Sequence, residues 1–439
     1  MNIIADLQLH SKYSQAVSKK MDLYEIASWA SKKGIHLVAT GDWQHPVWFT
    51  EIETHLKEVS DGIFTLKEKP DTQKHDVYFL LSSEISCIYT HYGKGRRVHN
   101  LIWSPSLGVS RKIIKRLEAY GANIRSDGRP IIGMSSKNLL QLILDVDPRC
   151  MLIPAHVWTP WFGLYGSKSG YDSIDECFED MADHIYAVET GLSSDPLMNW
   201  QIKELENRSI VSFSDAHSGP KLGREATVFE TTEGNERLTM KELTFDDVAA
   251  AIKSDIRGRL KIAHTIEFFP EEGKYHWDGH RNCNVKLSPE ETYKNGSTCP
   301  VCKRPLTIGV GHRIMDLADA QRNVTDMTVT IRDTADLAFV FDKEKKRTPF
   351  VSVVPLLEIL REITKSKTKS ERQYEALVSH FSTEFDILLT QPYEEIRKHA
   401  GPELAQAIKL VRQRKLDINP GYDGVYGTVH LFRDQKTLL

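Results

Sequence analysis

Histidine and acidic side chains recur at one kind of position in the first half of the chain, beside short apolar runs. Neutral imidazoles mixed with carboxylates are the ligand set of Zn, Mn or Fe in hydrolytic centres, where a carboxylate can bridge two ions. A single His at such a place is more often a hydrogen-bonded structural residue, but chance rarely repeats the placement so often. The sequence therefore predicts a multinuclear metal centre from Asp6, His10, Asp42, His45, Glu84, His99, His156, Glu189, Asp215 and His217.

A second cluster of potential ligands lies in a later segment rich in Gly, Cys, His and Pro. Cys283, Cys299 and Cys302 fall here, and His280 lies three positions before the first of them. Ligand pairs separated by two residues form tight knuckles, and two knuckles close a tetrahedral structural zinc site. We expect one structural Zn with His280 as the fourth ligand and His276 as the competing candidate. Free buried cysteines are the alternative.

The elements that must position these side chains follow from the apolar pattern. The expected strands are Ile3–Leu7, Ile35–Thr40, Val77–Ser82, Val98–Trp103, Met151–Pro154, Ile185–Val188 and Ile210–Ser214. The expected helices between them are Asp22–Lys33, Arg111–Tyr120, Ser136–Leu144, Ser173–Met181 and Met198–Glu206. This alternation indicates an α/β barrel or an open parallel sheet. Because the parallel strands of a barrel end on one face, the metal-binding side chains are expected to meet there.

Two further units are expected beyond the barrel. Four segments after the cysteine cluster have helical patterns, namely Val353–Ile363, Ser370–Phe381, Glu394–Ala400 and Pro402–Lys415. We therefore expect a metal-dependent domain at 1–265, a zinc-binding module at 266–313 and a mainly helical domain at 314–439.

Composition limits the class of protein. The 439 residues exceed what one core usually serves, and the 40% of apolar residues exclude a mainly disordered chain. No apolar run approaches the roughly 20 residues of a membrane helix, and the first residues lack a signal-peptide pattern, so we expect a cytoplasmic protein. The formal charge of −3 gives no overall attraction for nucleic acid, which must then bind to local patches.

Several segments resemble the ordered motifs of the PHP (polymerase and histidinol phosphatase) superfamily. They are Asp6-Leu7-Gln8-Leu9-His10-Ser11, Gly41-Asp42, Ser83-Glu84, Val98-His99-Asn100-Leu101, Pro154-Ala155-His156 and Ser214-Asp215-Ala216-His217. The resemblance implies a distorted (β/α)7 barrel, two or three divalent cations (Zn, Mn or Mg) and hydrolysis of phosphoester bonds.

Narrower motifs resemble the endonuclease Q family within that superfamily, over essentially the whole chain. They are Gly41–Pro46, Pro154–Phe162, the cysteine cluster and Pro420–Gly427. Members cut DNA on the 5′ side of deaminated bases (uracil, hypoxanthine and xanthine) and of abasic sites. The resemblance therefore implies a monomeric DNA repair endonuclease that acts on damaged double-stranded DNA, with a replication clamp as a further candidate partner.

The resemblance also implies roles for individual residues. Glu84, as the bridging carboxylate, would act in catalysis with Asp215, His10 and His217, while Asp6 and Glu189 would support the ligands. The cations would be held by Gln8, His10, Asp42, His45, Glu84, His99, His156, Asp215 and His217.

Gln8 departs from the pattern, since it replaces the first His of the family's His-x-His motif. An amide oxygen is a weak ligand beside an imidazole, so one metal position is expected to bind poorly. A lesion-binding protein without turnover is therefore one alternative, and a phosphatase of small phosphomonoesters is the other.

Basic and aromatic residues near the predicted metal centre could hold DNA. Cations would neutralise phosphates, and aromatic rings could stack on an extruded base. The alternatives without a role in DNA binding are core packing for the aromatic residues and a solvent-exposed turn for the arginines. The candidates are Arg96, Arg97, Trp158, Trp161, Phe162, Lys168, Ser169, Tyr422 and Tyr426.

Overall fold

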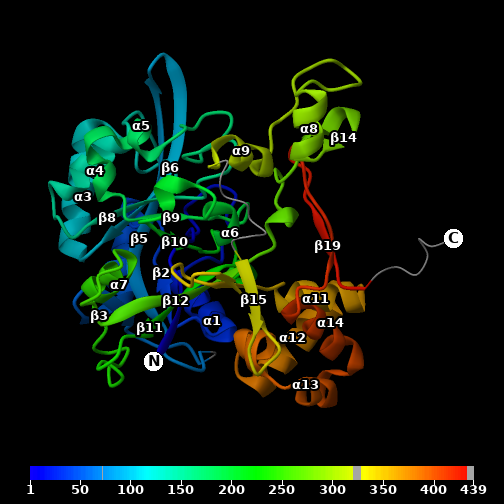
Figure 1. Cartoon of the computed structure of the whole chain (residues 1–439). Coiled ribbons are helices and arrows are strands. Elements are labelled where there is room, and N and C mark those ends of the chain that lie inside the picture. The colour runs from blue at the N-terminus through cyan, green and yellow to red at the C-terminus, as the bar shows by residue number, and fades with distance from the viewer. Residues whose placement is uncertain (72, 320–327, 433–439) are drawn as a thin grey trace.

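The computed structural model describes residues 1–71, 73–319 and 328–432 of the chain. Its N-terminal part is a distorted barrel flanked by helices, which confirms the predicted fold class (Figure 1). The barrel strands are β1 (Asn2–Asp6), β2 (Leu37–Ala39), β5 (Tyr78–His91), β6 (Lys94–Ser104), β8 (Met151–Pro154), β9 (Ala187–Glu189) and β10 (Ser209–Val211).

Neighbouring strands of the barrel differ in direction. β1, β2 and β5 run parallel, and so do β9 and β10, whereas β6 is antiparallel to both β5 and β8. Hydrogen bonds from Val157 N to Glu189 O and from His10 N to Ala216 O, both 3.1 Å long, join the β9–β10 pair to its neighbours on either side. The ring is thereby closed around an apolar interior.

The β5–β6 hairpin is where the structure departs from the expected all-parallel strands. The strand expected to end at Ser82 continues as far as His91. It includes the acidic Glu84, whose side chain is buried. A turn with Gly93 in the left-handed conformation, at a φ of 73°, then reverses the chain. Glu84 and His99 therefore lie inside hairpin strands rather than at strand ends. The hairpin projects beyond the barrel in Figure 1.

Helices of different lengths surround the barrel. They are α1 (Leu23–Lys33), α2 (Pro46–His55), α3 (Leu107–Tyr120), α4 (Ser136–Leu144), α5 (Ile174–Phe178), α6 (Pro196–Asn199) and α7 (Phe245–Ile252). In α1, the Asp22 side chain accepts the Glu25 N–H at 2.9 Å, and Gly34 ends the helix in the left-handed conformation. The expected helix Met198–Glu206 is wrong, because only the end of α6 and a 3-10 turn at Lys203–Leu205 occupy it.

The sheet extends beyond the barrel on both sides. On one side follow β11 (Ala226–Thr231), β12 (Leu260–Glu267), β17 (Phe350–Ser352), β16 (Ala338–Asp342) and β15 (Thr328–Arg332). On the other side lie β4 (Ile63–Leu66) and β3 (Leu56–Ser60), and β7 (Ile131–Ile132) pairs with β5. Because β15–β17 lie in the segment predicted to be mainly helical, that segment shares a sheet with the barrel. The domain boundary at residue 313 stays a prediction.

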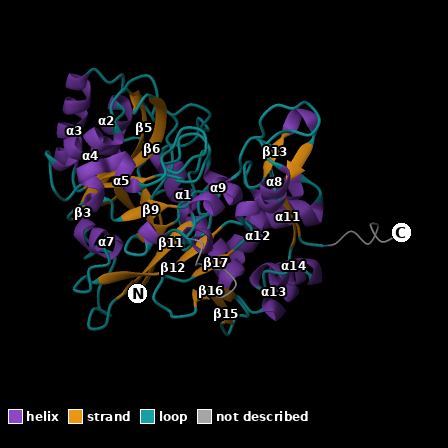
Figure 2. Ribbon diagram, turned by 45° about the horizontal axis from the view of Figure 1, so that its top comes forward, coloured by secondary structure: helices purple, strands orange, loops and turns teal. Residues whose placement is uncertain are grey.

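The cysteine cluster and the C-terminal helices form two further lobes. The cysteine lobe holds β13 (Asp278–His280), β14 (Val285–Leu287) and α8 (Pro289–Asn295), followed by α9 (Val310–Leu317). The four predicted C-terminal helices are present as α11 (Leu356–Thr364), α12 (Lys367–Phe381), α13 (Tyr393–Ala400) and α14 (Pro402–Arg412), which cluster in Figure 2. The hairpin of β18 (Asp417–Asn419) and β19 (Thr428–His430) runs between the two lobes in Figure 1.

A buried ion pair fixes the C-terminal helices to the barrel. Lys33 Nζ, at the end of α1, lies 2.7 Å from Glu384 Oε2, and both side chains are almost fully buried. Glu384 also accepts the Tyr374 hydroxyl at 2.8 Å and the Leu356 N–H at 3.0 Å. Because a buried charge without its partner is costly, this pair disfavours orientations of the helices that would separate Lys33 from Glu384.

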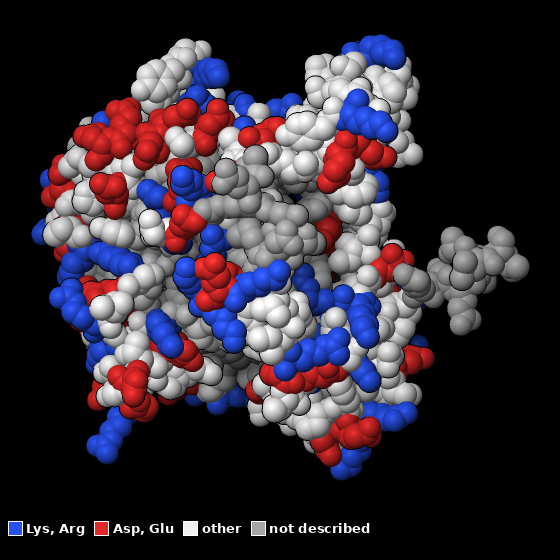
Figure 3. Space-filling view, in the orientation of Figure 1, with Lys and Arg blue, Asp and Glu red and all other residues white. Residues whose placement is uncertain are grey.

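Lys and Arg are interspersed with Asp and Glu over the face in Figure 3. Among the described residues, no helix combines the length and the hydropathy that crossing a membrane requires.

Candidate active site

Two groups of potential metal ligands lie beside each other at one end of the barrel. In each group the ligand atoms lie within 4.8 Å of one another. The His10 group follows β1 and β10, and the Glu84 group comes from β5, β6 and the residues after β8. The first consists of His10, Asp215 and His217, and the second of Glu84, His99 and His156.

Glu84 lies between the two groups. Its Oε2 is 3.4 Å from His10 Nε2, while its Oε1 is 2.5 Å from His99 Nδ1 and 3.7 Å from His156 Nε2. Burial acts to raise the pKa of Glu84, but His99 and Arg129 hold it well below its usual range. Glu84 is thus a buried, charged carboxylate whose two oxygens face different groups, which is the arrangement of a bridging ligand.

The His10 group contains two buried polar atoms that make ion-pair contacts but no hydrogen bond with any residue that the structure describes. His10 Nε2 and Asp215 Oδ1 lie 3.2 Å apart, and neither has a hydrogen-bond partner among the described residues. Burial would lower the pKa of His10, but Asp42, Asp215 and Glu84 raise it well above its ordinary value. The position attracts positive charge, and its imidazole and carboxylate donors fit a divalent cation.

Three of the candidate residues have positive φ angles. The values are 44° at Asp42, 30° at His156 and 46° at Asp215. Such conformations cost free energy for residues other than Gly, and they collect at functional sites where the surrounding structure enforces them.

Asp6 and Glu189 hold the segments that carry ligands. Asp6 accepts the Ser214 N–H at 3.0 Å, directly before Asp215, and Glu189 Oε2 accepts the His156 N–H at 2.5 Å. Burial raises the pKa of Asp6 to about 6 and that of Glu189 to about 7. Both side chains thus contact ligand segments through the backbone rather than through the ligand atoms.

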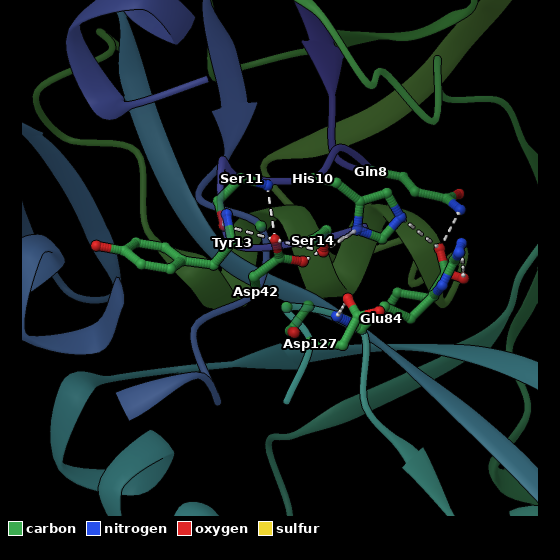
Figure 4. A network of polar contacts seen from close by, with 12 residues as sticks. Gln8, His10, Ser11, Tyr13, Ser14, Asp42, Glu84 and Asp127 are labelled. Atoms are coloured by element: carbon green, nitrogen blue, oxygen red, sulfur yellow. Dashed lines mark hydrogen bonds and ion pairs between the residues drawn. The ribbon is translucent and has the colours of Figure 1, made fainter. Parts of the chain in front are cut away.

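Asp42 and His45 lie outside both groups. Asp42 Oδ1 is 3.0 Å from His10 Nδ1, and its Oδ2 accepts the Ser11 N–H at 2.6 Å, so this carboxylate orients the His10 ring (Figure 4). His45 Nδ1 accepts the Trp48 N–H at 3.4 Å and caps α2. The expectation that these two residues bind cations stays a prediction.

The side-chain amide of Gln8 contacts the site through its nitrogen rather than its oxygen. Its Nε2 donates to Glu84 Oε2 at 2.9 Å (Figure 4), and within the described part of the chain its buried Oε1 has no hydrogen-bond partner. In this arrangement Gln8 fixes the carboxylate between the two groups.

A cavity of about 610 Å³ opens beside the two groups. His99, His156 and Asp215 contribute to its lining, together with Arg129 and Tyr275. Arg129 and Tyr275 were not predicted from the sequence, because each lies in a segment without a recognisable motif. The turn residues Gly128 and Pro130 around Arg129 were the one local signal.

Four of the predicted DNA contacts face the cavity or the solvent near it. Trp161 and Phe162 line the cavity, and the exposed Arg97 has its guanidinium carbon 5.7 Å from the Phe162 ring centroid. Lys168 is exposed, and its backbone N–H donates to Pro160 O at 2.9 Å, so it lies next to the cavity lining.

Three predicted DNA contacts are buried instead, so their role in DNA binding stays a prediction. Trp158 is fully buried and stacks on Tyr165 with ring centroids 4.7 Å apart, so here core packing is the better interpretation. The Arg96 guanidinium lies 4.0 Å from the Tyr171 ring centroid and is largely buried. Ser169 is also buried and accepts the Phe162 N–H at 3.3 Å.

The two C-terminal tyrosines have different surroundings. Tyr422 donates its hydroxyl to Asn284 Oδ1 at 2.9 Å and forms a backbone bridge with Trp277, so it connects the C-terminal segment to the cysteine lobe. Tyr426 is 68% exposed, with Lys274 Nζ 4.6 Å from its ring centroid.

The cysteine lobe brings together the four residues expected to bind zinc. The side chains of His280, Cys283, Cys299 and Cys302 place their ligand atoms within 4.8 Å of one another. His276, the competing candidate, is not in this group, and burial lowers its pKa to about 4. One imidazole with three thiols is a ligand set of structural zinc.

Solved structures of known proteins match this chain over nearly its full length. The lesion-specific endonuclease PfuEndoQ from Pyrococcus furiosus is 30% identical with a TM-score of 0.79, and the match covers 99% of this chain and 98% of that one. A structure of endonuclease Q with a 27-mer duplex substrate, which has an abasic lesion at the active site, is 31% identical with a TM-score of 0.80. That match covers 99% of this chain and 97% of the other.

Two further matches concern parts of the chain. The family model of the MJ0043 C-terminal domain matches residues 355–415, which span the C-terminal helices. The uncharacterized protein MJ0043 of Methanocaldococcus jannaschii is 30% identical over 285 residues, which are 64% of this chain and 32% of MJ0043. The matched part thus spans about a third of that relative's length.

Proposed function

Since this chain belongs to the endonuclease Q family, we propose that it hydrolyses the DNA phosphodiester on the 5′ side of a damaged nucleotide. The observation that carries the proposal is the position of Glu84 between two ligand groups, beside a cavity that both groups help to line. The proposed substrates are duplexes with uracil, hypoxanthine, xanthine or an abasic site. The cut would leave the lesion at the 5′ end of the downstream fragment.

The two groups would each hold a divalent cation, with Zn, Mn and Mg as the candidates. When bound, such cations polarise a phosphate and lower the pKa of water. The chain's own residues orient the ligands. His217 Nδ1 donates to Asp215 O at 2.8 Å, and Asp42 Oδ1 lies 3.0 Å from His10 Nδ1, so each contact orients an imidazole ring of the site.

The reaction is a hydrolysis in which water adds across one P–O bond. Phosphorus gains the hydroxyl group, and the departing sugar oxygen gains the proton. No base is removed from its sugar, so the protein is not proposed to be a glycosylase.

The cavity suits a nucleotide that has turned out of the duplex. Trp161, Phe162 and Tyr275 give it an aromatic lining on which a base can stack. Turning out costs least where base pairing is already weak or absent, which favours damaged sites. Arg97 and Lys168 are the proposed contacts to the DNA backbone beside the cavity, because both are exposed cations.

The hydrogen bond from Gln8 to Glu84 favours one alternative, a lesion-binding protein without turnover. A His at this position would offer a ring nitrogen to a cation, whereas Gln8 offers an N–H to the carboxylate. Both candidate functions include binding to damaged DNA, but only the endonuclease cuts it.

An incision assay separates the functions. The chain and its Gln8→His variant would be mixed with end-labelled duplexes that have one uracil, one hypoxanthine, one abasic site or no lesion, in Mn, Mg or Zn. A nick 5′ of the lesion by either protein, with the intact duplex uncut, supports the endonuclease. Tight binding with no nick by either protein would support the binding protein. Phosphate release from histidinol phosphate without a nick would support a phosphatase.

A further inference from the structure

The cavity beside the metal-ligand groups has a single permanently charged cation in its lining. The lining residues are all described, and among them Arg129 is the one Lys or Arg. A phosphodiester that enters this cavity brings a negative charge towards the carboxylates Glu84 and Asp215. Arg129 is therefore placed where a phosphate needs a counter-charge from the protein.

The backbone around Arg129 is held firmly. Asp127 Oδ1 accepts the Arg129 N–H at 2.9 Å, and the carbonyl of Pro130 accepts the Ser86 N–H at 3.0 Å. Gly128 packs so closely under the Asp42 and Ser14 side chains that a Cβ would have no room. These contacts connect the Arg129 segment directly to the residue that orients His10.

The guanidinium itself is only lightly engaged. Its Nη1 lies 3.4 Å from Glu84 Oε1, and in the described ranges of the chain this is the one acceptor it meets. The side chain is 27% exposed, so it can be reached from the cavity. A guanidinium stays charged in a folded protein, so Arg129 offers a permanent positive charge. A guanidinium has five N–H donors, of which this contact uses one.

The inference from these observations rests on the proposed function and adds a further catalytic residue to it. We propose that the Arg129 guanidinium binds the non-bridging oxygens of the phosphate that is cut. A planar guanidinium can donate two parallel hydrogen bonds to one phosphate, which Lys cannot do. The same contact stabilises the charge that develops on those oxygens as water attacks. The alternative is a structural ion pair, in which Arg129 only neutralises Glu84.

Single-turnover cutting of an abasic-site duplex in Mn gives the first test. Arg129→Gln is expected to slow cutting about a hundredfold or more, and Arg129→Lys is expected to recover only part of the rate. Arg125→Gln is the matched control, because Arg125 lies exposed on the same loop outside the cavity lining, and it is expected to cut at nearly the normal rate. Normal cutting by Arg129→Gln, or a loss of Mn from this variant by elemental analysis, would overturn the proposal.

Binding gives the second test and does not depend on cutting. The duplex would have either its normal phosphate or a charge-neutral methylphosphonate 5′ of the lesion, and affinity would be measured in Ca²⁺ by fluorescence anisotropy. If Arg129 contacts this phosphate, the methylphosphonate weakens binding to the natural chain about tenfold and to Arg129→Gln much less. Equal weakening of both proteins would contradict the contact. If neither the chain nor Gln8→His cuts any duplex in any metal, the proposed endonuclease is refuted, whereas this difference in affinity would still decide the role of Arg129.

Discussion

The barrel and the cysteine lobe both gather metal-ligand side chains, but with very different amounts of supporting structure. The barrel ligands come from distant segments of a closed sheet, and the buried acids Asp6, Asp42 and Glu189 hold the ligands or their segments in place. In the cysteine lobe, short segments around one two-stranded sheet supply the ligands, and Cys299 is the one ligand classed as buried.

We therefore expect the barrel site to form without an ion, and the site in the cysteine lobe to form only when an ion binds. The barrel brings His10 and Asp215 together at a cost in backbone strain and in buried polar atoms that lack a hydrogen bond among the described residues, which its large core can offset. The lobe has few buried apolar side chains of its own, so we expect an ion held by its His and Cys side chains to contribute to its folding. Removal of metal should therefore affect structure in the lobe and chemistry in the barrel.

The largest effect is expected when the zinc site of the lobe is broken. Cys299→Ser should make the segment 276–306 lose its order, because structural zinc sites supply folding free energy directly. Hydrogen exchange read by mass spectrometry should show loss of protection in that segment, with the barrel peptides unchanged. Cys150→Ser, at a buried cysteine outside the cluster, is the control. Full protection of the segment in Cys299→Ser would contradict the comparison.

Loss of Glu84, the proposed bridging carboxylate, should affect cutting rather than folding. Glu84→Gln is expected to reduce cutting about a thousandfold, because a neutral amide cannot take the place of a charged bridging ligand. The melting temperature should stay within about 5 °C of the natural chain, since the barrel has a large apolar core of its own. Glu118→Gln, at an exposed site on α3, should change neither property. An unfolded Glu84→Gln protein would mean that the barrel also depends on its metal site.

A smaller effect concerns pH, at a carboxyl group that lies away from the ligands. Burial, with Asp195 and Glu189, raises the pKa of Glu267 to about 8 in spite of hydrogen bonds from Ser212 and Thr265. The folded protein then holds a proton that the unfolded chain releases near pH 4.5, so stability falls as the pH rises from about 4.5 to about 8.

Glu267→Gln removes this titration from the folded protein. Urea unfolding at pH 6 and at pH 8.5 should show that the natural chain loses more stability between these values than the variant does. Parallel losses in the two proteins would show that Glu267 is already charged at pH 6.

The smallest effect is expected at His45, which caps α2 in the structure but was predicted from the sequence to bind a cation. His45→Ala should lower the free energy of unfolding by about 1 kcal/mol through loss of the α2 cap, with cutting and Mn content unchanged. His45→Asn should recover the stability, since Asn is a strong capping residue. A loss of Mn in His45→Ala would instead make His45 a ligand.

The sequence predicted the barrel, the cysteine cluster and the convergence of the ligand groups, because each depends on a local pattern. Apolar runs define strands, and paired ligands two residues apart define knuckles. The hairpin was not predicted, because a charged residue such as Glu84 after an apolar run usually indicates that the strand has ended. Only the contacts of Glu84 with other buried side chains show that the strand continues through it. Those partners, such as His99, come from the opposite hairpin strand.

The nucleic-acid surface was the least predictable part of the site. Trp158 and Trp161 are three residues apart in one aromatic segment, yet the first packs in the core and the second lines the cavity. Sequence spacing in a loop does not fix the direction of a side chain. Arg129 was missed for a related reason, since its role depends on a cavity that only the folded chain defines.

Elemental analysis of the natural chain and of Glu84→Ala, purified in Mn and Zn, tests the central claim most directly. The natural chain is expected to hold the ion of the cysteine lobe and at least one further ion, and Glu84→Ala is expected to lose the further ion while it keeps the first. A natural chain with one ion, held by Cys283, Cys299 and Cys302 alone, would contradict this claim.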